Sequence, residues 1–273
     1  MIPMRKTSLL GKIGLFVFIF AFKMPSVYGF SVNPGRADFT VTAGKECVKE
    51  FFITNSEEGA VYVKATLTDI MRIMPELKSK EGEGKVSLKN DYLLTKFSKI
   101  YPEKVLVGPN SIGKINLKIN MPKDAKGEYY GSIFFESMPT EENKENTVSI
   151  ANKIGMALYI AIEGTKIFKC EIGKYEILTA APLSFRLNVK NSGNVHIRPE
   201  GYISFKRNKE GTELQVPLNT IYAPILPNTE LDIGTKRTEF VLLPGEYTAF
   251  VHLEYGEGHV LNEELRFTVP EKK

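Results

Sequence analysis

The chain has 273 residues, of which 42% are hydrophobic and 11% aromatic, enough apolar material to build cores and to exclude an intrinsically disordered protein. Its net charge of +4 comes entirely from four basic residues among the first 29, which include no acidic residue, so the rest carries 32 positive and 32 negative side chains. A chain with this neutral balance gives no electrostatic footprint for nucleic-acid binding, so we expect no nucleic-acid partner.

Residues 1–29 have the order of features found in a secretory signal peptide. Basic residues precede an apolar run at 13–22, and small or branched residues close the segment at 27–29. The run is well short of the roughly 20 residues that a membrane-spanning helix needs, so cleavage is favoured over an uncleaved anchor. We therefore expect the mature chain to begin near Phe30, to hold no transmembrane segment and to work outside the cytoplasm.

Downstream of this segment, apolar and polar residues alternate, as is typical of strands. Short runs rich in β-branched and aromatic residues, bounded by Gly, Pro, Asn and Ser, occur at 50–53, 61–67, 115–119, 132–136, 185–189, 202–205, 248–255 and 264–269. Strands of this length and spacing predict a sandwich or barrel and not a parallel α/β sheet. Only residues 77–99 are ambiguous enough to hold a helical turn or two.

Three short motifs occur twice in the same order, which indicates a repeated unit. They are Asn55-Ser56 and Asn191-Ser192, Pro109-Asn110-Ser111 and Pro227-Asn228-Thr229, and Gly127-Glu128-Tyr129 and Gly245-Glu246-Tyr247. The first two suit turns, and the third resembles the tyrosine corner of immunoglobulin-like sandwiches. The sequence therefore predicts an all-β protein with two immunoglobulin-like β-sandwich domains in tandem, at residues 30–165 and 166–273.

Cys47 and Cys170 are the only cysteines and fall in different predicted domains. An oxidising compartment allows two thiols to pair where their geometry permits. Two separate buried thiols are an equally good interpretation, and both remain open from the sequence.

The motifs of common catalytic and cofactor sites are absent from the sequence. No Gly-x-Ser-x-Gly, phosphate-binding glycine loop, Cys-x-x-Cys or His-Glu-x-x-His motif occurs. His252, Glu254 and His259 are predicted on one hairpin, where exposed polar residues explain them better than a metal site. The carboxylate pairs at 57–58, 141–142 and 263–264 suit a solvated surface. We predict a protein that is not an enzyme and needs no cofactor or metal.

The segment that closes the first predicted domain alternates strongly. One strand face would hold Ile154, Met156, Leu158, Ile160 and Ile162, and the other would hold Gly155, Ala157, Tyr159 and Ala161. One interpretation is a last strand that packs on its own core. The other is an edge that, together with Val148 and Ile150, pairs with another polypeptide by strand addition.

The order of these features resembles the periplasmic pilus-assembly chaperones. The resemblance is carried by the signal peptide, the Arg36-Ala37-Asp38-Phe39 strand, a strand ending in Asn, the Gly-Glu-Tyr strand, a long polar loop at 139–147 and the alternating strand before the second sandwich. It implies two immunoglobulin-like domains that meet at an angle. It also implies a cleft whose basic pair holds the terminal carboxylate of a pilin subunit.

The resemblance assigns site residues one by one. Arg36 matches the cleft arginine of the family, whereas Gly155 occupies the place of its lysine, so Lys153, two residues earlier on the same face, is the candidate substitute. The strand-addition residues implied are Val148, Ile150, Ile154, Met156 and Leu158. The partners implied are secreted pilin-like subunits and an outer-membrane usher, and the compartment implied is the periplasm.

The second predicted domain suggests an alternative. Residues 191–201 look more like the second sandwich of Gram-positive cell-surface proteins that bind wall-associated partners. The alternative function is therefore a cell-surface adhesion or cell-wall-binding module with no role in client folding.

Overall fold

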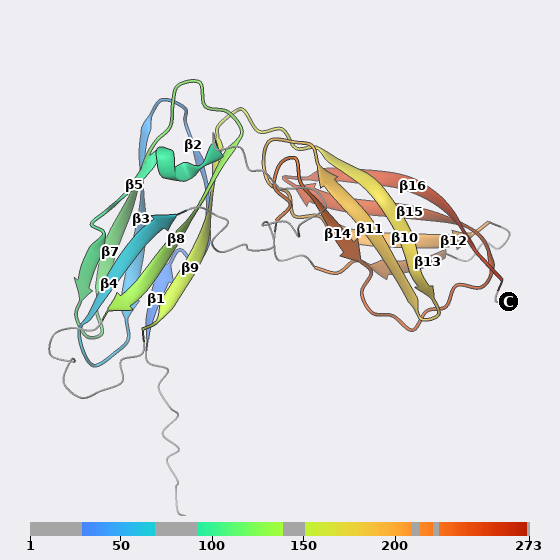
Figure 1. Ribbon diagram of the computed structural model, residues 1–273, viewed down its shortest axis with the longest axis horizontal. Helices are drawn as coiled ribbons and strands as arrows, with labels where there is room; N and C mark the ends of the chain where they lie inside the picture. The colour runs from blue at the N-terminus through green and yellow to red at the C-terminus, as the bar shows by residue number, and fades with distance from the viewer. Residues whose placement is uncertain (1–28, 69–91, 139–150, 209–212, 221–223, 272–273) are drawn as a thin grey trace, which may run out of the picture.

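A computed structural model describes residues 29–68, 92–138, 151–208, 213–220 and 224–271. In these residues the chain forms two elongated β-sandwiches that meet at one end, with their long axes at an angle (Figure 1). The prediction of an all-β protein with two tandem immunoglobulin-like sandwiches is confirmed. The described residues include no helix of the length and apolarity that crossing a membrane requires.

Two facing sheets form the first sandwich. One has the order β1 (Phe30–Asn33), β3 (Glu46–Asn55), β7 (Ile112–Asn120), β5 (Ser98–Tyr101). The other has the order β2 (Ala37–Val41), β9 (Lys153–Ile162), β8 (Glu128–Met138), β4 (Val61–Thr68), β6 (Lys104–Val107). The N-terminal segment therefore changes sheets between β1 and β2, and β2 runs parallel to the end of β9.

The second sandwich is built in the same way from the C-terminal part of the chain. Its smaller sheet has the order β10 (Cys170–Ala180), β11 (Leu183–Asn191), β14 (Glu230–Gly234). Its larger sheet has the order β13 (Glu213–Pro217), β12 (Glu200–Arg207), β15 (Gly245–Gly256), β16 (His259–Val269). All pairings within these two sheets are antiparallel.

Each sandwich has its own hydrophobic core, because alternate residues along the strands point inward. Fully buried residues such as Phe51 and Phe135 occupy the first core, and Phe185 and Phe205 occupy the second. Burying one such side chain contributes about 1.5–3 kcal/mol. All the strands predicted by alternation are therefore present, and each contributes residues to one of these two cores.

The repeated motifs have equivalent roles in the two sandwiches. The amide nitrogen of Asn55 donates to the carbonyl oxygens of Gly59 (2.8 Å) and Gly108 (3.0 Å), and that of Asn191 donates to those of Val195 (2.8 Å) and Ile225 (2.8 Å). Both asparagines are fully buried. Each therefore ties the end of its strand to two separate turns, and the predicted turn role of these motifs is confirmed.

The Pro-Asn-Ser and Pro-Asn-Thr motifs lie in turns, and the Gly-Glu-Tyr motifs open strands β8 and β15. Asn110 and Asn228 both have positive φ, at 49° and 60°. The Tyr247 hydroxyl donates to the carbonyl oxygen of Leu243 at 2.9 Å, a bond of the tyrosine-corner kind. Of the ambiguous segment 77–99, the described part holds a single 3₁₀ turn, η4 (Leu94–Lys96).

Cys47 and Cys170 are both free thiols. Cys47 lies half-buried on β3 of the first sandwich, and Cys170 is buried at the start of β10 in the second. Of the two interpretations, separate thiols are confirmed, because the cysteines belong to different cores.

Candidate functional site

The linker between the sandwiches, residues 163–169, is held by hydrogen bonds to both of them. The Thr165 hydroxyl accepts from the N–H of Gly127 in the first sandwich at 2.9 Å. The Asn194 side chain in the second donates to the Thr165 carbonyl at 2.9 Å and accepts from the Ile167 N–H at 2.6 Å. Gly127 has a φ of 71°, and a Cβ there would lie 2.9 Å from the Asn194 carbonyl oxygen, so glycine allows the close approach.

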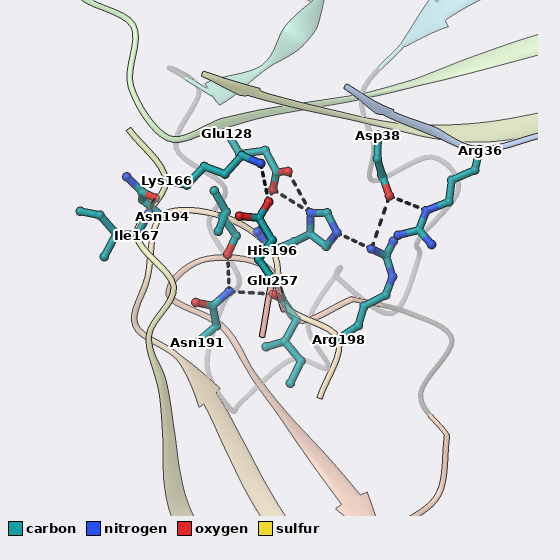
Figure 2. Close-up of polar contacts among 12 residues, drawn as sticks. Arg36, Asp38, Glu128, Lys166, Ile167, Asn191, Asn194, His196, Arg198 and Glu257 are labelled. Carbon is teal, nitrogen blue, oxygen red and sulfur yellow. Dashed lines mark hydrogen bonds and ion pairs between the residues drawn. The ribbon is translucent and has the colours of Figure 1, made fainter. Parts of the chain in front are cut away.

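A cleft of about 350 Å³ lies beside this linker and is lined by both domains. The charged and polar side chains at its wall include those of Arg36, Asp38, Glu128, Tyr159, Lys166, His196, Arg198 and Glu257. Figure 2 shows polar groups converging here from the start of β2, β8, the linker, the loop between β11 and β12 and the turn between β15 and β16, namely Arg36, Asp38, Glu128, Lys166, His196, Arg198 and Glu257. The cleft is therefore a place where side chains from distant parts of the sequence meet.

Glu128 is a buried carboxylate at the first residue of β8. It accepts a hydrogen bond from the backbone N–H of His196 at 2.7 Å and lies 2.9 Å from the ring Nδ1 of the same residue. Its side chain is only 4% exposed and that of His196 13%. A hydrogen bond to a charged group contributes about 1.5–3 kcal/mol, so this pair is a strong link between the domains.

Two arginines approach the carboxylate of Asp38 from different domains. Arg36, directly before β2, donates to it through Nε. Arg198, on the loop before β12, has its Nη1 at 3.8 Å from it and also contacts Nε2 of His196. Burial and the neighbouring charge of Arg36 lower the pKa of Arg198.

Tyr159 on β9 lies between these charged groups. Its ring centroid is 4.3 Å from that of His196 and 5.2 Å from the guanidinium carbon of Arg198. Burial raises the pKa of the Tyr159 hydroxyl, although the positive charge of Arg198 acts to lower it. The ring is therefore a neutral platform under a cation, a favourable cation–π arrangement.

The described residues include no group of three or more His, Cys, Asp or Glu side chains placed to hold a metal ion. Instead, Nδ1 of His252 contacts the Asn262 amide oxygen at 2.7 Å, and the His259 ring stacks on Phe168 at 4.8 Å. The three residues lie on one hairpin as predicted, and Val260, not His259, pairs with Glu254. The turn of this hairpin holds only Glu257 and Gly258, and a bulge lies between Glu254 and Gly256.

Neither a family model nor a curated protein sequence matches the chain. Solved structures do match. The class 5 fimbriae chaperone CfaA covers 89% of this chain and 100% of its own, with 15% identity and a TM-score of 0.50. The YadV chaperone (10% identity, 87% and 99% covered, TM-score 0.47) and SafB of Salmonella enterica, solved with the SafA pilin (8%, 90% and 99%, TM-score 0.46), are also similar.

The match with CfaA extends over both sandwiches, because it covers 89% of the chain. The chain has the fold of a fimbrial chaperone. The resemblance predicted from the sequence is thereby confirmed at the level of the fold. Within this fimbrial-chaperone fold, the structure gives the positions of Arg36, Lys153 and the predicted strand-addition residues on β9.

The structure does not bring Arg36 and Lys153 together. Arg36 lines the cleft, whereas Lys153 does not and begins β9. Ala37 pairs with Leu158, so Lys153 lies four residues, about 13 Å along a strand, before the position beside Arg36. There its amine is 3.2 Å from a carboxylate oxygen of Glu136.

The first half of β9 is paired along one edge only, with β8. Its pairing with β8 runs without a break from Lys153 to Ala161, whereas β2 covers only Leu158 to Ile162. Among the described residues, no strand pairs with the other side of residues 153–157. This half of β9 is therefore an open sheet edge.

The register fixes which backbone groups this edge offers. The N–H of Ile162 donates to the Gly127 carbonyl, and that of Ser137 donates to the Asn152 carbonyl. Because hydrogen-bonded pairs alternate along an antiparallel ladder, residues 152, 154 and 156 face β8 with their N–H and C=O groups. The backbone groups of 153, 155 and 157 point away from β8.

The predicted strand-addition residues have different environments. Met156 and Leu158 are 6% and 0% exposed and belong to the core of their own sandwich, so the structure corrects the expectation that their side chains are available to a client. Ile154 is half-buried and packs at the margin of that core. Val148 and Ile150 lie outside the described residues.

Sequence reasoning did not assign Arg198 or His196 to the cleft. Both lie in the segment 191–201, which was interpreted by its likeness to another class of surface protein. Glu128 was noted only as part of the repeated Gly-Glu-Tyr motif. Its equivalent Glu246 is exposed, so the motif alone carried no signal that one of the two glutamates links the domains.

Proposed function

We propose that this protein is a non-enzymatic, exported chaperone that binds subunits of a fimbria or another surface fibre by β-strand addition. The observation that carries the proposal is the open edge of β9 at residues 153–157. An extended client segment placed there would accept and donate main-chain hydrogen bonds at 153, 155 and 157. The fold shared with CfaA supports the same role.

Apolar side chains at the start of this edge would select which client segments bind. Ile154 is accessible in part, and Val148 and Ile150 precede it on the chain. In strand addition, alternate side chains fill pockets of the partner while the backbone supplies affinity. Met156 and Leu158 hold the strand in its own sandwich and so position the edge.

Arg36 provides the second element of the proposal, a cationic group for the terminal carboxylate of the client. Its side chain is 66% exposed at the cleft wall. A charge-assisted hydrogen bond to a chain terminus fixes the register of the added strand, which backbone pairing alone leaves free to slip.

Export to the periplasm and delivery to an outer-membrane usher complete the proposal. The signal-like segment 1–29 supports export, and β1 begins at Phe30, directly after the proposed cleavage point. CfaA, whose fold this chain shares, is a chaperone of fimbriae, which supports a pilin-like subunit as the client here.

Fluorescence anisotropy tests strand addition directly. The probe is a short fluorescein-labelled peptide of alternating valine and threonine, with the same peptide N-methylated at alternate residues as control. The Gly155→Pro variant removes an N–H that points away from β8, so the β8–β9 ladder stays intact while the client loses a donor. We expect both changes to weaken binding; wild-type affinity in Gly155→Pro would exclude this edge as the site.

A further inference from the structure

The second domain has a long open sheet edge of its own, the outer side of β16. The larger sheet ends on this strand (Figure 1), and no other strand of the described ranges pairs with its outer side. β16 follows β15 without a shift from Val260 to Val269. The other edge strands of this domain are short or irregular: β13 and β14 have five residues each, and two bulges interrupt β10. A long, regular edge is a template for pairing with a further strand.

The register shows which backbone groups this edge offers. The N–H of Asn208, directly after β12, donates to the carbonyl oxygen of Glu246 on β15 at 3.0 Å, so Glu246 faces β12. Its partner Thr268 on β16 therefore faces away from β15. Because this orientation alternates, the N–H and C=O groups of 260, 262, 264, 266 and 268 point outward. The Tyr175 hydroxyl of the facing sheet accordingly reaches the Arg266 carbonyl oxygen at 3.0 Å.

The side chains of these outward-facing residues carry charges of both signs. Glu264 and Arg266 are neighbours on the outer face of the sheet, where Nη2 of Arg266 donates to the Glu264 carboxylate at 2.8 Å. Their side chains are 43% and 79% exposed. Edges that are protected from pairing carry charges that repel an approaching strand. An edge with one charge of each sign repels some strands and attracts others.

A second copy of the same edge is complementary to it. When two copies of β16 lie antiparallel with a twofold axis at Leu265, Glu264 of each copy is directly opposite Arg266 of the other. The same placement puts the exposed Asn262 of each copy opposite the exposed Thr268 of the other. Opposite charges directly across a strand pair are favourable, and a twofold axis makes each such pair occur twice.

The charges also select a single register for this pairing. A shift of two residues in one direction places Glu264 opposite the same residue of the other copy, and a shift in the other direction does so for Arg266. Like charges in directly opposite positions are destabilising. A shift of one residue brings outward-facing backbone groups against residues whose groups face β15, so the hydrogen-bonded ladder is lost.

Apolar surface lies beside the same edge, between the two sheets of the sandwich. A groove of about 430 Å³ runs between β10 and β16, and its lining includes Tyr175, Ile177, Leu178, Phe267 and Val269. Tyr175 is 37% exposed and Leu178 44%. A copy paired with β16 lies along the margin of this groove, where it would remove apolar surface from water.

We infer that two copies of this protein associate through β16, so that their larger sheets join into one across a twofold axis at Leu265. The Arg266 carbonyl oxygen has two lone pairs and can accept from the other copy while it keeps the Tyr175 hydroxyl. Because a single strand pair buries little surface, the dimer is weak and forms at about 0.1 mM protein. The edge proposed for clients, on β9 of the first domain, stays open in this dimer.

Sedimentation velocity of charge variants tests the pairing. Glu264→Arg leaves only cations at positions 264 and 266, and Arg266→Glu leaves only anions. We expect each variant alone to dimerise at least about tenfold more weakly than wild-type protein. An equimolar mixture of the two variants should dimerise as wild-type protein does, because every cation then lies opposite an anion.

The matched controls are Glu50→Arg and Lys114→Glu, which make the same changes of charge at an exposed ion pair of 2.7 Å in the first domain. Both should dimerise like wild-type protein. Wild-type protein that stays monomeric at about 0.1 mM, charge variants at 264 and 266 that dimerise undiminished, or a mixture that stays monomeric would each overturn the inference. So would a dimer that persists in Glu264→Arg and is lost in Gly155→Pro, since its contact would lie at β9. Circular dichroism verifies that each variant is folded.

Discussion

The carboxylate of Glu128, in the first domain, accepts a hydrogen bond from the backbone N–H of His196, in the second, at 2.7 Å, and its oxygens lie 2.9 Å from the histidine ring Nδ1. Arg198 contacts the opposite ring nitrogen. Since an arginine donates and never accepts, Nε2 is the acceptor and Nδ1 carries the hydrogen. One histidine therefore connects the buried acid of one domain with the cleft arginine of the other.

Replacing Glu128 by alanine tests this link. We expect the free energy of unfolding to fall by at least about 2 kcal/mol, because the buried N–H and ring of His196 lose their charged acceptor. Scanning calorimetry measures the effect. Glu246→Ala is the matched control: Glu246 occupies the same place in the repeated motif but is exposed, so its loss should cost less than about 0.5 kcal/mol. Equal effects at the two positions would refute the link.

We expect the buried asparagines that end β3 and β11 to contribute strongly to the folding stability of their domains. Asn191→Ala removes two donated hydrogen bonds and one accepted from the Gly193 N–H, and leaves buried carbonyl groups without their donor. We expect a loss of about 2–3 kcal/mol, measured by urea unfolding followed by circular dichroism. Asn55→Ala should have a similar effect in the first domain. A loss below about 0.5 kcal/mol would contradict this role.

Gly201 on β12 allows a close approach of the neighbouring strand's backbone. A Cβ there would lie 1.9 Å from the carbonyl oxygen of His252 on the neighbouring strand β15. Gly201→Ala should therefore destabilise the domain by about 1–3 kcal/mol or more, because backbone must shift. Gly59→Ala, where a Cβ meets nothing within 4 Å, is the control. The melting temperatures of the two variants test this prediction. A decrease in melting temperature for Gly201→Ala no larger than for Gly59→Ala would rule out the clash.

The two free thiols should differ in reactivity. Burial, with smaller contributions from Glu171 and Glu263, raises the pKa of the Cys170 thiol to about 12. At about pH 8 we expect iodoacetamide to modify the half-buried Cys47 first and Cys170 only after unfolding, as measured by mass spectrometry. Rapid modification of native Cys170 would show that its surroundings open to solvent.

The same pKa shift has a consequence for stability. Between about pH 9 and pH 12 the Cys170 thiol ionises in the unfolded chain but stays protonated in the fold, so stability should fall as pH rises through this window. Below about pH 9 the thiol is protonated in both states and contributes no slope. Cys170→Ala should remove this component of the pH dependence; an unchanged slope in that variant would contradict it.

Part of the fold could be predicted because strands that pack one face on a core must alternate. Residues 61–67 and 185–189 show this alternation and became β4 and β11. β10 could not be predicted, since two bulges, between Ile172 and Tyr175 and between Ile177 and Thr179, interrupt its alternation. Short edge strands such as β6 and β14 offer too few residues for a pattern.

The candidate site could be predicted only where one strand carries it. The alternating segment from Ile154 indicated either a core strand or an edge, and it is both: its bulky side chains fill the core while half of its backbone edge stays open. The approach of Arg36 and Arg198 to one carboxylate, that of Asp38, could not be predicted. The two arginines are separated by 162 positions, and no local pattern marks residues that meet across a domain boundary.

By itself, the sequence determined the two sandwiches, their repeated turns and the neutral balance of the chain beyond residue 29, because alternation, turn chemistry and charge are local properties that need no neighbour. Only the tertiary structure decided which of two equivalent glutamates is buried, that Lys153 lies away from the cleft, and that Arg198 of the second domain approaches the same Asp38 carboxylate as Arg36. Those outcomes depend on how the two sandwiches meet, and close contacts between distant segments arise only when the cores that position them have formed.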